Sequence, residues 1–177
     1  MTTLDDLGPR ICVMGPSNSG KSTLAEAIAR RQDLPPVHLD QLYHLPFTDW
    51  EPRRTADFVR LHDEAIAHDR WVMDGNYANC MPQRLARATG LILLDCPTAI
   101  SLYRYVLRCW RGGSRRGGLA GGQDSVKWAM LRHIAVVTPP KRARYQALFD
   151  QLALPKVYLR TPRALDEFRR REQLPAP

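Results

Sequence analysis

A glycine-rich stretch near the start of the chain carries the clearest chemistry. Residues 15–22 read G-P-S-N-S-G-K-S, which satisfies the P-loop pattern. Such a loop turns its backbone N–H groups toward the phosphates of a nucleoside triphosphate, at the positive end of the following helix. Lys21 would contact the β- and γ-phosphate oxygens, and the Ser22 hydroxyl would ligate Mg²⁺. We therefore expect ATP to bind the loop residues Gly15, Pro16, Ser17, Asn18, Ser19, Gly20, Lys21, Ser22 and Thr23.

Aspartates close three of the apolar runs that are expected to be strands. Asp74 ends the run 71–74 and suits the Walker-B role, in which a carboxylate holds Mg²⁺ directly or through water. Asp95 is a rival for that role, with a helix cap as its plainer alternative. Asp40 ends the run 37–40 and could deprotonate or orient an attacking hydroxyl, or position Mg²⁺. A simple turn residue is the alternative for Asp40 and Asp74.

Basic residues recur at helical spacing in the second half of the chain. The series comprises Arg104, Arg108, Arg111 and Arg115, which one face of a continuous helix would carry. Like charges at these spacings oppose the helix by roughly 0.2–0.5 kcal/mol for each pair, unless an anion lies beside them. A triphosphate in phosphoryl transfer is such an anion. We expect these arginines to be catalytic with Lys21 and Asp40; a solvated basic face is the alternative.

The arginine series runs into a glycine-rich segment. Residues 112–122 hold six of the eleven glycines of the chain. We interpret about 111–124 as a mobile lid whose closure would exclude water, the competing acceptor of the phosphoryl group. A flexible surface loop is the alternative.

The positive charge of the chain is concentrated rather than general. The net charge is +8, and residues 96–149 hold ten basic residues and one acid, which leaves the remainder near −1. A basic segment of this kind is also compatible with nucleic-acid binding, although no motif that reads RNA or DNA accompanies it. We expect the triphosphate to account for these charges.

The acceptor is expected to bind in a region of about 41–69. The loop 41–50 mixes aromatic residues with few charges, which is consistent with a ring-bearing substrate. Arginine pairs that could grip an anionic substrate follow this loop and the third expected strand. They are Arg53 with Arg54, and Arg84 with Arg87. From these we select Asp40, Tyr43, Arg53 and Arg84 as the substrate-binding candidates; surface positions are the alternative for the arginines.

Strand and helix patterns alternate along the chain and would position these residues. The expected strands are 11–14, 37–40, 71–74, 91–95 and 156–159. The expected helices are 22–31, 55–68, 83–88, 98–111, 125–152 with a break near Pro139, and 162–171. Continuous apolar strands separated by helices favour a parallel sheet covered on both faces. We therefore expect one α/β domain over residues 1–177.

Several classes of protein are excluded by the sequence. The N-terminus is acidic and lacks the apolar stretch of a signal peptide, and no apolar run is long enough to span a membrane. The four cysteines have no C-x-x-C spacing, which favours reduced thiols in a cytoplasmic protein. The string N-K-x-D of guanine-nucleotide switches does not occur.

The ordered set of motifs resembles the small P-loop kinases of the adenylate kinase and shikimate kinase type. More narrowly, it is similar to the adenylate-kinase-like bacterial proteins called DNA topology modulation proteins. The matching pieces are G-P-S-N-S-G-K-S-T, H-L-D-Q-L-Y, R-W-V-M-D-G-N-Y, R-L-A-R-A, L-I-L-L-D-C-P and K-V-Y-L-R-T-P. Together they cover most of the chain, and the P-loop is the most specific of them.

The resemblance implies a three-layer P-loop fold with a five-stranded parallel sheet in order 2-3-1-4-5. It also implies helices on both faces, a substrate-binding region after the second strand, and an Arg/Gly-rich lid after the fourth. Nucleoside monophosphate kinases carry D-G-F-P-R after the third strand, and its arginine grips the acceptor phosphate. Residues 74–78 read D-G-N-Y-A instead, which argues against a true adenylate kinase and makes Arg84 the candidate substitute.

The leading hypothesis is an ATP- and Mg²⁺-dependent phosphotransferase. It would move the γ-phosphoryl group of ATP to a hydroxyl or phosphate of a small molecule, with nucleosides and nucleotides among the candidates. The alternatives are a P-loop ATPase and a nucleotide-dependent regulator that binds nucleic acid. The expected partners are ATP, Mg²⁺ and the acceptor, without a membrane.

Overall fold

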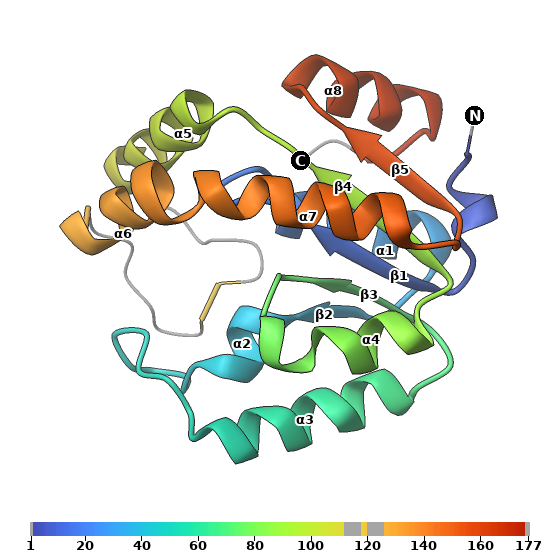
Figure 1. Cartoon of the computed structure of the whole chain (residues 1–177), viewed down its shortest axis with the longest axis horizontal. Coiled ribbons are helices and arrows are strands. Elements are labelled where there is room, and N and C mark those ends of the chain that lie inside the picture. The colour runs from blue at the N-terminus through green and yellow to red at the C-terminus, as the bar shows by residue number, and fades with distance from the viewer. Residues whose placement is uncertain (1, 112–117, 120–125, 176–177) are drawn as a thin grey trace.

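Five parallel strands form one sheet in the order β2-β3-β1-β4-β5 (Figure 1). The computed structural model describes residues 2–111, 118–119 and 126–175. The strands are β1 (Arg10–Met14), β2 (Pro36–His38), β3 (Trp71–Asp74), β4 (Gly90–Leu94) and β5 (Lys156–Leu159). This order confirms the one that the sequence motifs imply.

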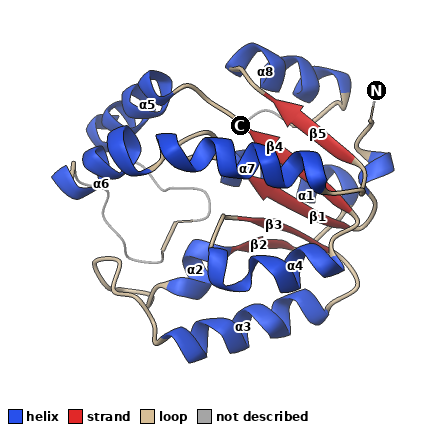
Figure 2. Ribbon diagram, viewed as in Figure 1, coloured by secondary structure: helices blue, strands red, loops and turns tan. Residues whose placement is uncertain are grey.

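Helices cover both faces of this sheet and give the molecule three layers (Figure 2). The longer helices are α1 (Lys21–Gln32), α3 (Thr55–Ala67), α5 (Thr98–Arg111), α7 (Pro139–Gln151) and α8 (Pro162–Arg171). The short helices are α2 (Leu39–Tyr43), α4 (Met81–Arg87) and α6 (Trp128–Arg132), with 3₁₀ turns at Asp5–Leu7 and Ala78–Cys80 and a π-helical turn at His133–Val137.

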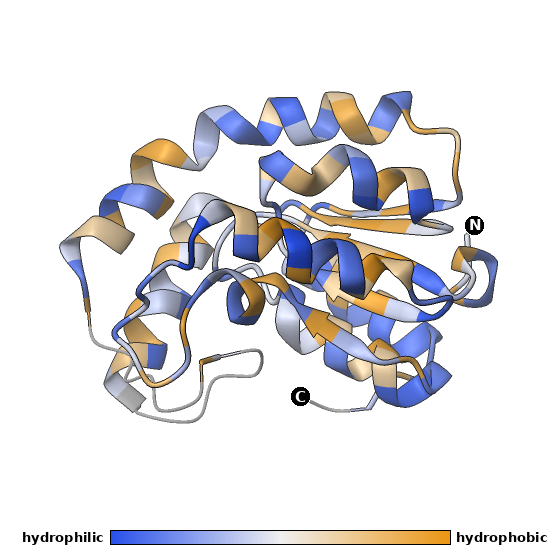
Figure 3. Cartoon of the chain, turned by 90° about the horizontal axis from the view of Figure 1, so that it is seen from below, coloured by the Kyte–Doolittle hydropathy of each residue, from blue (hydrophilic) through white to orange (hydrophobic). Residues whose placement is uncertain are grey.

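Alternating side chains of β1 separate two hydrophobic cores. Ile11 and Val13 belong to the core beneath α1 and α8, whereas Cys12 and Met14 belong to the core beneath α3, α4 and α7. The first core includes Leu24, Ile28, Leu165 and Phe168. The second includes Phe58, Ile66, Leu85 and Phe149. Figure 3 shows the resulting pattern, with hydrophobic strands inside and helices that alternate between hydrophobic and hydrophilic residues. Burial on both faces explains why the strands read as continuous apolar runs.

The carboxyl ends of β1, β2 and β3 meet at one edge of the sheet. In the register of the strands, Asp74 of β3 pairs with His38 of β2 on one side and Val13 of β1 on the other. The glycine-rich loop follows β1 directly, so it lies at the same edge. Ligands of open α/β sheets bind beyond this edge, which makes it the place to look for a site.

One expected strand end is wrong. β2 stops at His38, and α2 begins at Leu39, so Asp40 lies in the first turn of a short helix instead of at the end of a strand. The buried side chain of Leu39 and the bond from the His44 N–H to the Asp40 carbonyl fix this turn. An apolar run this short does not distinguish a strand from the start of a helix.

The expected helix 125–152 is divided into three parts. α6 and the π-helical turn precede Thr138, and α7 begins with Pro139 and Pro140. A proline in the first turn of a helix costs no hydrogen bond, because the first N–H groups have no partner within the helix. The break predicted near Pro139 is therefore confirmed.

No helix among the described residues is both long and apolar enough to cross a membrane. The four cysteines are free thiols, of which Cys12, Cys80 and Cys96 are buried and Cys109 is half-buried.

Candidate active site

The loop between β1 and α1 has a backbone that requires glycine at both of its ends. Gly15 has a φ of +148°, and a Cβ there would lie 2.5 Å from the carbonyl oxygen of Leu94. Gly20 has a φ of +98° and forms the N-cap of α1. Because Gly20 has no side chain, no capping side chain competes for the N–H groups of the first turn. The loop therefore has the shape and the open helix end that a phosphate requires.

The lysine of the motif lies across the loop. The Nζ atom of Lys21 donates to the carbonyl oxygen of Pro16 at 2.8 Å. This contact holds the ammonium group over the glycine-rich turn, where the phosphates would lie.

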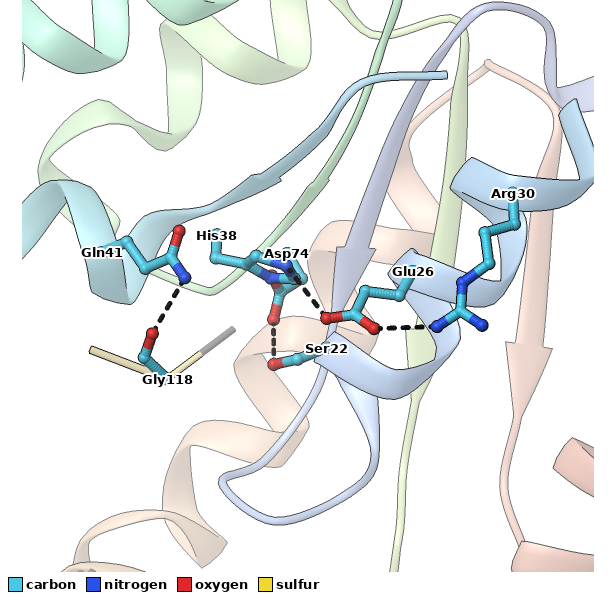
Figure 4. A network of polar contacts seen from close by, with 7 residues as sticks. All are labelled: Ser22, Glu26, Arg30, His38, Gln41, Asp74 and Gly118. Carbon is cyan, nitrogen blue, oxygen red and sulfur yellow. Dashed lines mark hydrogen bonds and ion pairs between the residues drawn. The ribbon is translucent and has the colours of Figure 1, made fainter. Parts of the chain in front are cut away.

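A chain of polar contacts connects the start of α1 with the ends of β2 and β3 (Figure 4). The Ser22 hydroxyl donates to Oδ2 of Asp74 at 2.7 Å. The other carboxylate oxygen of Asp74, Oδ1, lies 2.5 Å from Nδ1 of His38. Nε2 of His38 lies 3.7 Å from Oε1 of Glu26, which pairs in turn with Arg30 at 3.3 Å. The sequence missed His38 in this arrangement because only the strand register brings it beside Asp74.

The imidazole of His38 is surrounded by acids. Burial alone would lower its pKa, but the hydrogen bond and charge of Asp74 raise it, together with the charges of Glu26 and Asp40. The net shift is upward from the ordinary value. Nδ1 of His38 lies within hydrogen-bonding distance of Oδ1 of Asp74, where an Nδ1–H would donate to the carboxyl oxygen.

Ser22 and Asp74 form a donor set that suits magnesium. A hydroxyl and a carboxylate oxygen are hard ligands, and Mg²⁺ is bound in nucleotide sites by one or two such groups with phosphates and water. Within the described ranges, no group of three or more His, Cys, Asp or Glu residues could hold a metal ion alone.

Asn76 fastens the beginning of the glycine-rich loop to the segment after β3. Its side-chain Oδ1 accepts from the Gly15 N–H at 3.1 Å, and its Nδ2 donates to the Gly15 carbonyl at 2.8 Å. Arg84 supports the same segment from below, since its guanidinium donates to the carbonyl of Gly75 at 3.2 Å and of Asn76 at 3.4 Å. Apart from its place after Asp-Gly, nothing in the sequence singles out Asn76.

The guanidinium of Arg84 is engaged inside the protein. Its side chain is fully buried, and its donors face main-chain carbonyls and the sulfur of Cys80. In this structure Arg84 thus makes structural contacts from α4, and its expected contact with the acceptor stays a prediction.

Two of the four expected catalytic arginines reach the glycine-rich loop. Arg104 donates from Nη1 to the Ser19 carbonyl at 3.1 Å, and Arg108 donates from Nη1 to Oδ1 of Asn18 at 2.6 Å. Both come from α5, which ends at Arg111. Arg115 and most of the proposed lid lie outside the described residues.

The candidate acceptor side lies around α2. Oδ1 of Asp40 accepts from the Tyr77 hydroxyl at 2.7 Å. The ring of Tyr43 packs edge-on against Phe58, with centroids 5.2 Å apart, and tilted against Tyr77 at 4.8 Å. The Arg53 N–H donates to the Tyr43 carbonyl at 2.7 Å, which closes the loop between them. Asp40, Tyr43 and Arg53 are thus brought to one side of the site.

A contact from the start of the acceptor region also frames the site. Nε2 of Gln41 donates to the carbonyl of Gly118 at 2.9 Å and joins α2 to the segment after α5 (Figure 4). The pKa of His133 is lowered, first by burial and then by the charges of Lys141 and Lys21. His133 begins the π-helical turn, which helix periodicity alone does not predict.

Solved structures share this fold at low sequence identity. A gluconokinase from Sinorhizobium meliloti 1021 has a TM-score of 0.54 and 18% identity, over 94% of this chain and 95% of its own. A shikimate kinase from Bacteroides thetaiotaomicron has a TM-score of 0.52 and 19% identity, over 93% and 96%. No protein-family model matches the sequence, and no curated protein matches it. At these identities the likeness establishes the shared fold and nothing finer.

Both carboxylate oxygens of Asp95 are engaged by other side chains. Its Oδ1 accepts from Nε of Arg142 at 2.5 Å, and its Oδ2 accepts from the Tyr158 hydroxyl at 2.9 Å. The carboxylate thus joins α7 to β5, whereas Asp74 faces Ser22. Of the two expected rivals, Asp74 is the one beside the P-loop.

Proposed function

We propose that the protein is an ATP- and Mg²⁺-dependent phosphotransferase that moves the γ-phosphoryl group of ATP to a small-molecule hydroxyl or phosphate. The observation that carries the proposal is the contact of Ser22 with Asp74 directly beneath a complete P-loop. Further support comes from the fold, since the gluconokinase and the shikimate kinase that share it are kinases by name. The motifs also support the narrower likeness to the DNA topology modulation proteins, whose name does not specify a reaction.

ATP would be held by the loop from Gly15 to Thr23. Its N–H groups and the α1 N-terminus would bind the β- and γ-phosphates, and Lys21 would move from the Pro16 carbonyl to the phosphate oxygens. Ser22 and Asp74 would hold Mg²⁺, which neutralises charge on the phosphates when bound. Arg104 and Arg108 already lie against the loop and would stabilise the charge of the transferred group. Arg111 and Arg115 stay candidates for the same role.

The acceptor would bind beside α2, in the region of about 41–69. Asp40 would accept the proton of an attacking hydroxyl, and the Tyr77 hydroxyl that it now binds would keep the carboxylate in place. Tyr43 and Arg53 would line this side of the site. Arg84, the candidate for an acceptor phosphate, is buried and bound to main-chain carbonyls, and this supports a hydroxyl acceptor over a nucleoside monophosphate.

The proposal is tested by a screen for ATP consumption with Lys21→Ala and a matched control. Nucleosides, nucleotides, sugars and sugar acids are offered in turn with ATP and Mg²⁺. We expect Lys21→Ala to lower the rate of phosphoryl transfer about 10²-fold or more, because it removes the positive charge that would stabilise the transferred phosphoryl group. Arg31→Ala, an exposed change on the same helix, is expected to act like the parent protein. Equal unfolding temperatures would show that the fold is intact.

The same measurements separate a kinase from the alternatives. Equal turnover by Lys21→Ala and the parent protein would contradict the proposal. Phosphate release at full rate without any acceptor would favour an ATPase. Binding of DNA at low salt that disappears at high salt would favour a nucleic-acid-binding regulator.

A further inference from the structure

His38 contacts the second carboxylate oxygen of Asp74, Oδ1, from a neighbouring strand. It ends β2, and its pairing with Asp74 in the sheet is set by the backbone register. Its side chain is 8% exposed, beneath α1. Nδ1 faces Asp74 at 2.5 Å, and Nε2 faces Glu26 at 3.7 Å (Figure 4).

The carboxylate of Asp74 is held at both of its oxygens. Oδ1 accepts from His38, and Oδ2 accepts from the Ser22 hydroxyl at 2.7 Å. Rotation of the carboxylate would break both bonds at once. Asp74 is also 5% exposed, so bulk water is poorly placed to replace either partner. The orientation of the group therefore depends on the imidazole as much as on the serine.

We propose that His38 is a positioning residue of the magnesium site, which fixes Asp74 so that Oδ2 faces Ser22 and the bound metal. The inference depends on the proposed function, because it assumes a metal–nucleotide complex at Ser22 and Asp74. His38 itself does not touch the metal or the nucleotide. It acts by holding a ligand, and Glu26 orients the ring from its opposite nitrogen.

The alternative is that His38 merely fills space in the core. A core role predicts lower stability for every substitution, without any effect that depends on magnesium. A positioning role predicts that magnesium is affected selectively. The two are separated by measuring nucleotide binding rather than turnover.

The experiment measures binding of β,γ-methylene ATP by calorimetry, with Mg²⁺ and with EDTA. We expect the parent protein to bind more tightly with Mg²⁺. In His38→Leu the affinity in EDTA is expected to stay unchanged, while the gain from Mg²⁺ falls about tenfold or more, as is usual when a partner of a metal ligand is removed. His38→Asn is expected to keep the gain, because its amide nitrogen occupies the position of Nδ1 and can donate to Asp74.

His62→Leu is the matched control. His62 is also a buried histidine whose Nδ1 lies beside a carboxylate, at 3.0 Å from Asp63, but it lies on α3 and away from Ser22. Its loss is expected to leave the magnesium gain unchanged. Should His38→Leu fail to fold, His38→Gln replaces it, because its amide nitrogen lies one bond further out and faces the Glu26 side.

Each outcome decides the matter. A full magnesium gain in the Leu or Gln variant overturns the role of His38, and so does a loss in His38→Asn as large as in His38→Leu. An equal loss in His62→Leu also overturns it. If the parent protein itself does not bind the analogue, the proposed function fails, and this result is distinct from the others.

Discussion

At the scale of single residues, the position of the phosphate loop depends on one amide side chain. Asn76 makes two hydrogen bonds to the backbone of Gly15, as an adjacent strand would. Loss of a hydrogen bond of this kind costs about 1 kcal/mol. We expect Asn76→Ala to weaken ATP binding about tenfold, since the loop would no longer be fixed at its first glycine, and calorimetry would measure this.

The chain provides a neighbouring asparagine as the control for this change. Asn79 is exposed on the 3₁₀ turn that follows, so Asn79→Ala is expected to bind ATP like the parent protein. An unchanged affinity for ATP in Asn76→Ala would mean that the loop keeps its shape without the two hydrogen bonds from Asn76.

Residues of the site differ in how well the sequence predicts them. Lys21, Ser22 and the loop glycines follow from one contiguous motif, because neighbours in sequence are neighbours in the loop. The contacts of Asn76 with Gly15 and of His38 with Asp74 depend on partners that are distant in sequence. The only signals were the Asn after Asp-Gly and the His at the end of an apolar run, and both also suit ordinary turns and cores.

At the scale of elements, α5 turns one face toward the glycine-rich loop and another toward solvent. Arg104 and Arg108 face the glycine-rich loop, whereas Tyr103 is 66% exposed. We expect Arg104→Ala and Arg108→Ala each to lower the rate of phosphoryl transfer about 10²-fold. Each change removes a positively charged hydrogen-bond donor that would stabilise the transferred phosphoryl group. Steady-state rates with saturating ATP would measure this.

The outward residue of the same helix supplies the control. Tyr103→Ala is expected to leave the rate unchanged, since the ring contributes little to the buried side of α5. A rate that falls equally in all three variants would indicate a general loss of α5 rather than a role for the arginines.

The elements themselves were largely predictable, and the exceptions have a physical cause. β3, β5, α5 and α8 agree with their expected bounds because each has an unambiguous apolar pattern or a proline at its start. The boundary between β2 and α2 was placed two residues late, because V-H-L-D fits a strand and a helix start equally well. The π-helical turn has no distinctive sequence pattern at all.

At the scale of the whole molecule, the sheet order brings segments distant in sequence to one edge. Asn18 meets Arg108, Ser22 meets Asp74, and Asp40 meets Tyr77. The order 2-3-1-4-5 places β1 between β3 and β4, so the loop after β1 lies centrally among these partners. The resemblance to P-loop kinases predicted this strand order. The individual side-chain pairs could be identified only from the structure.

Global stability should depend on pH through His62. Its side chain is fully buried on α3, and among the described atoms its Nε2 has no hydrogen-bond partner. Burial chiefly lowers the pKa of His62, the charge of Arg84 adds to this, and Asp63 opposes it. The folded pKa thus lies below that of the unfolded chain, so the unfolded chain takes up a proton first as the pH falls.

This sign predicts that the contribution of His62 to stability is complete above about pH 6.5 and is lost below it. The loss can reach at most about 1.4 kcal/mol per pH unit. Urea unfolding at a series of pH values should therefore show a smaller decline on acidification for His62→Leu than for the parent protein. His68→Leu, an exposed change at the end of the same helix, should decline like the parent protein. A His62→Leu curve parallel to that of the parent protein would mean that the buried ring titrates normally in the folded state.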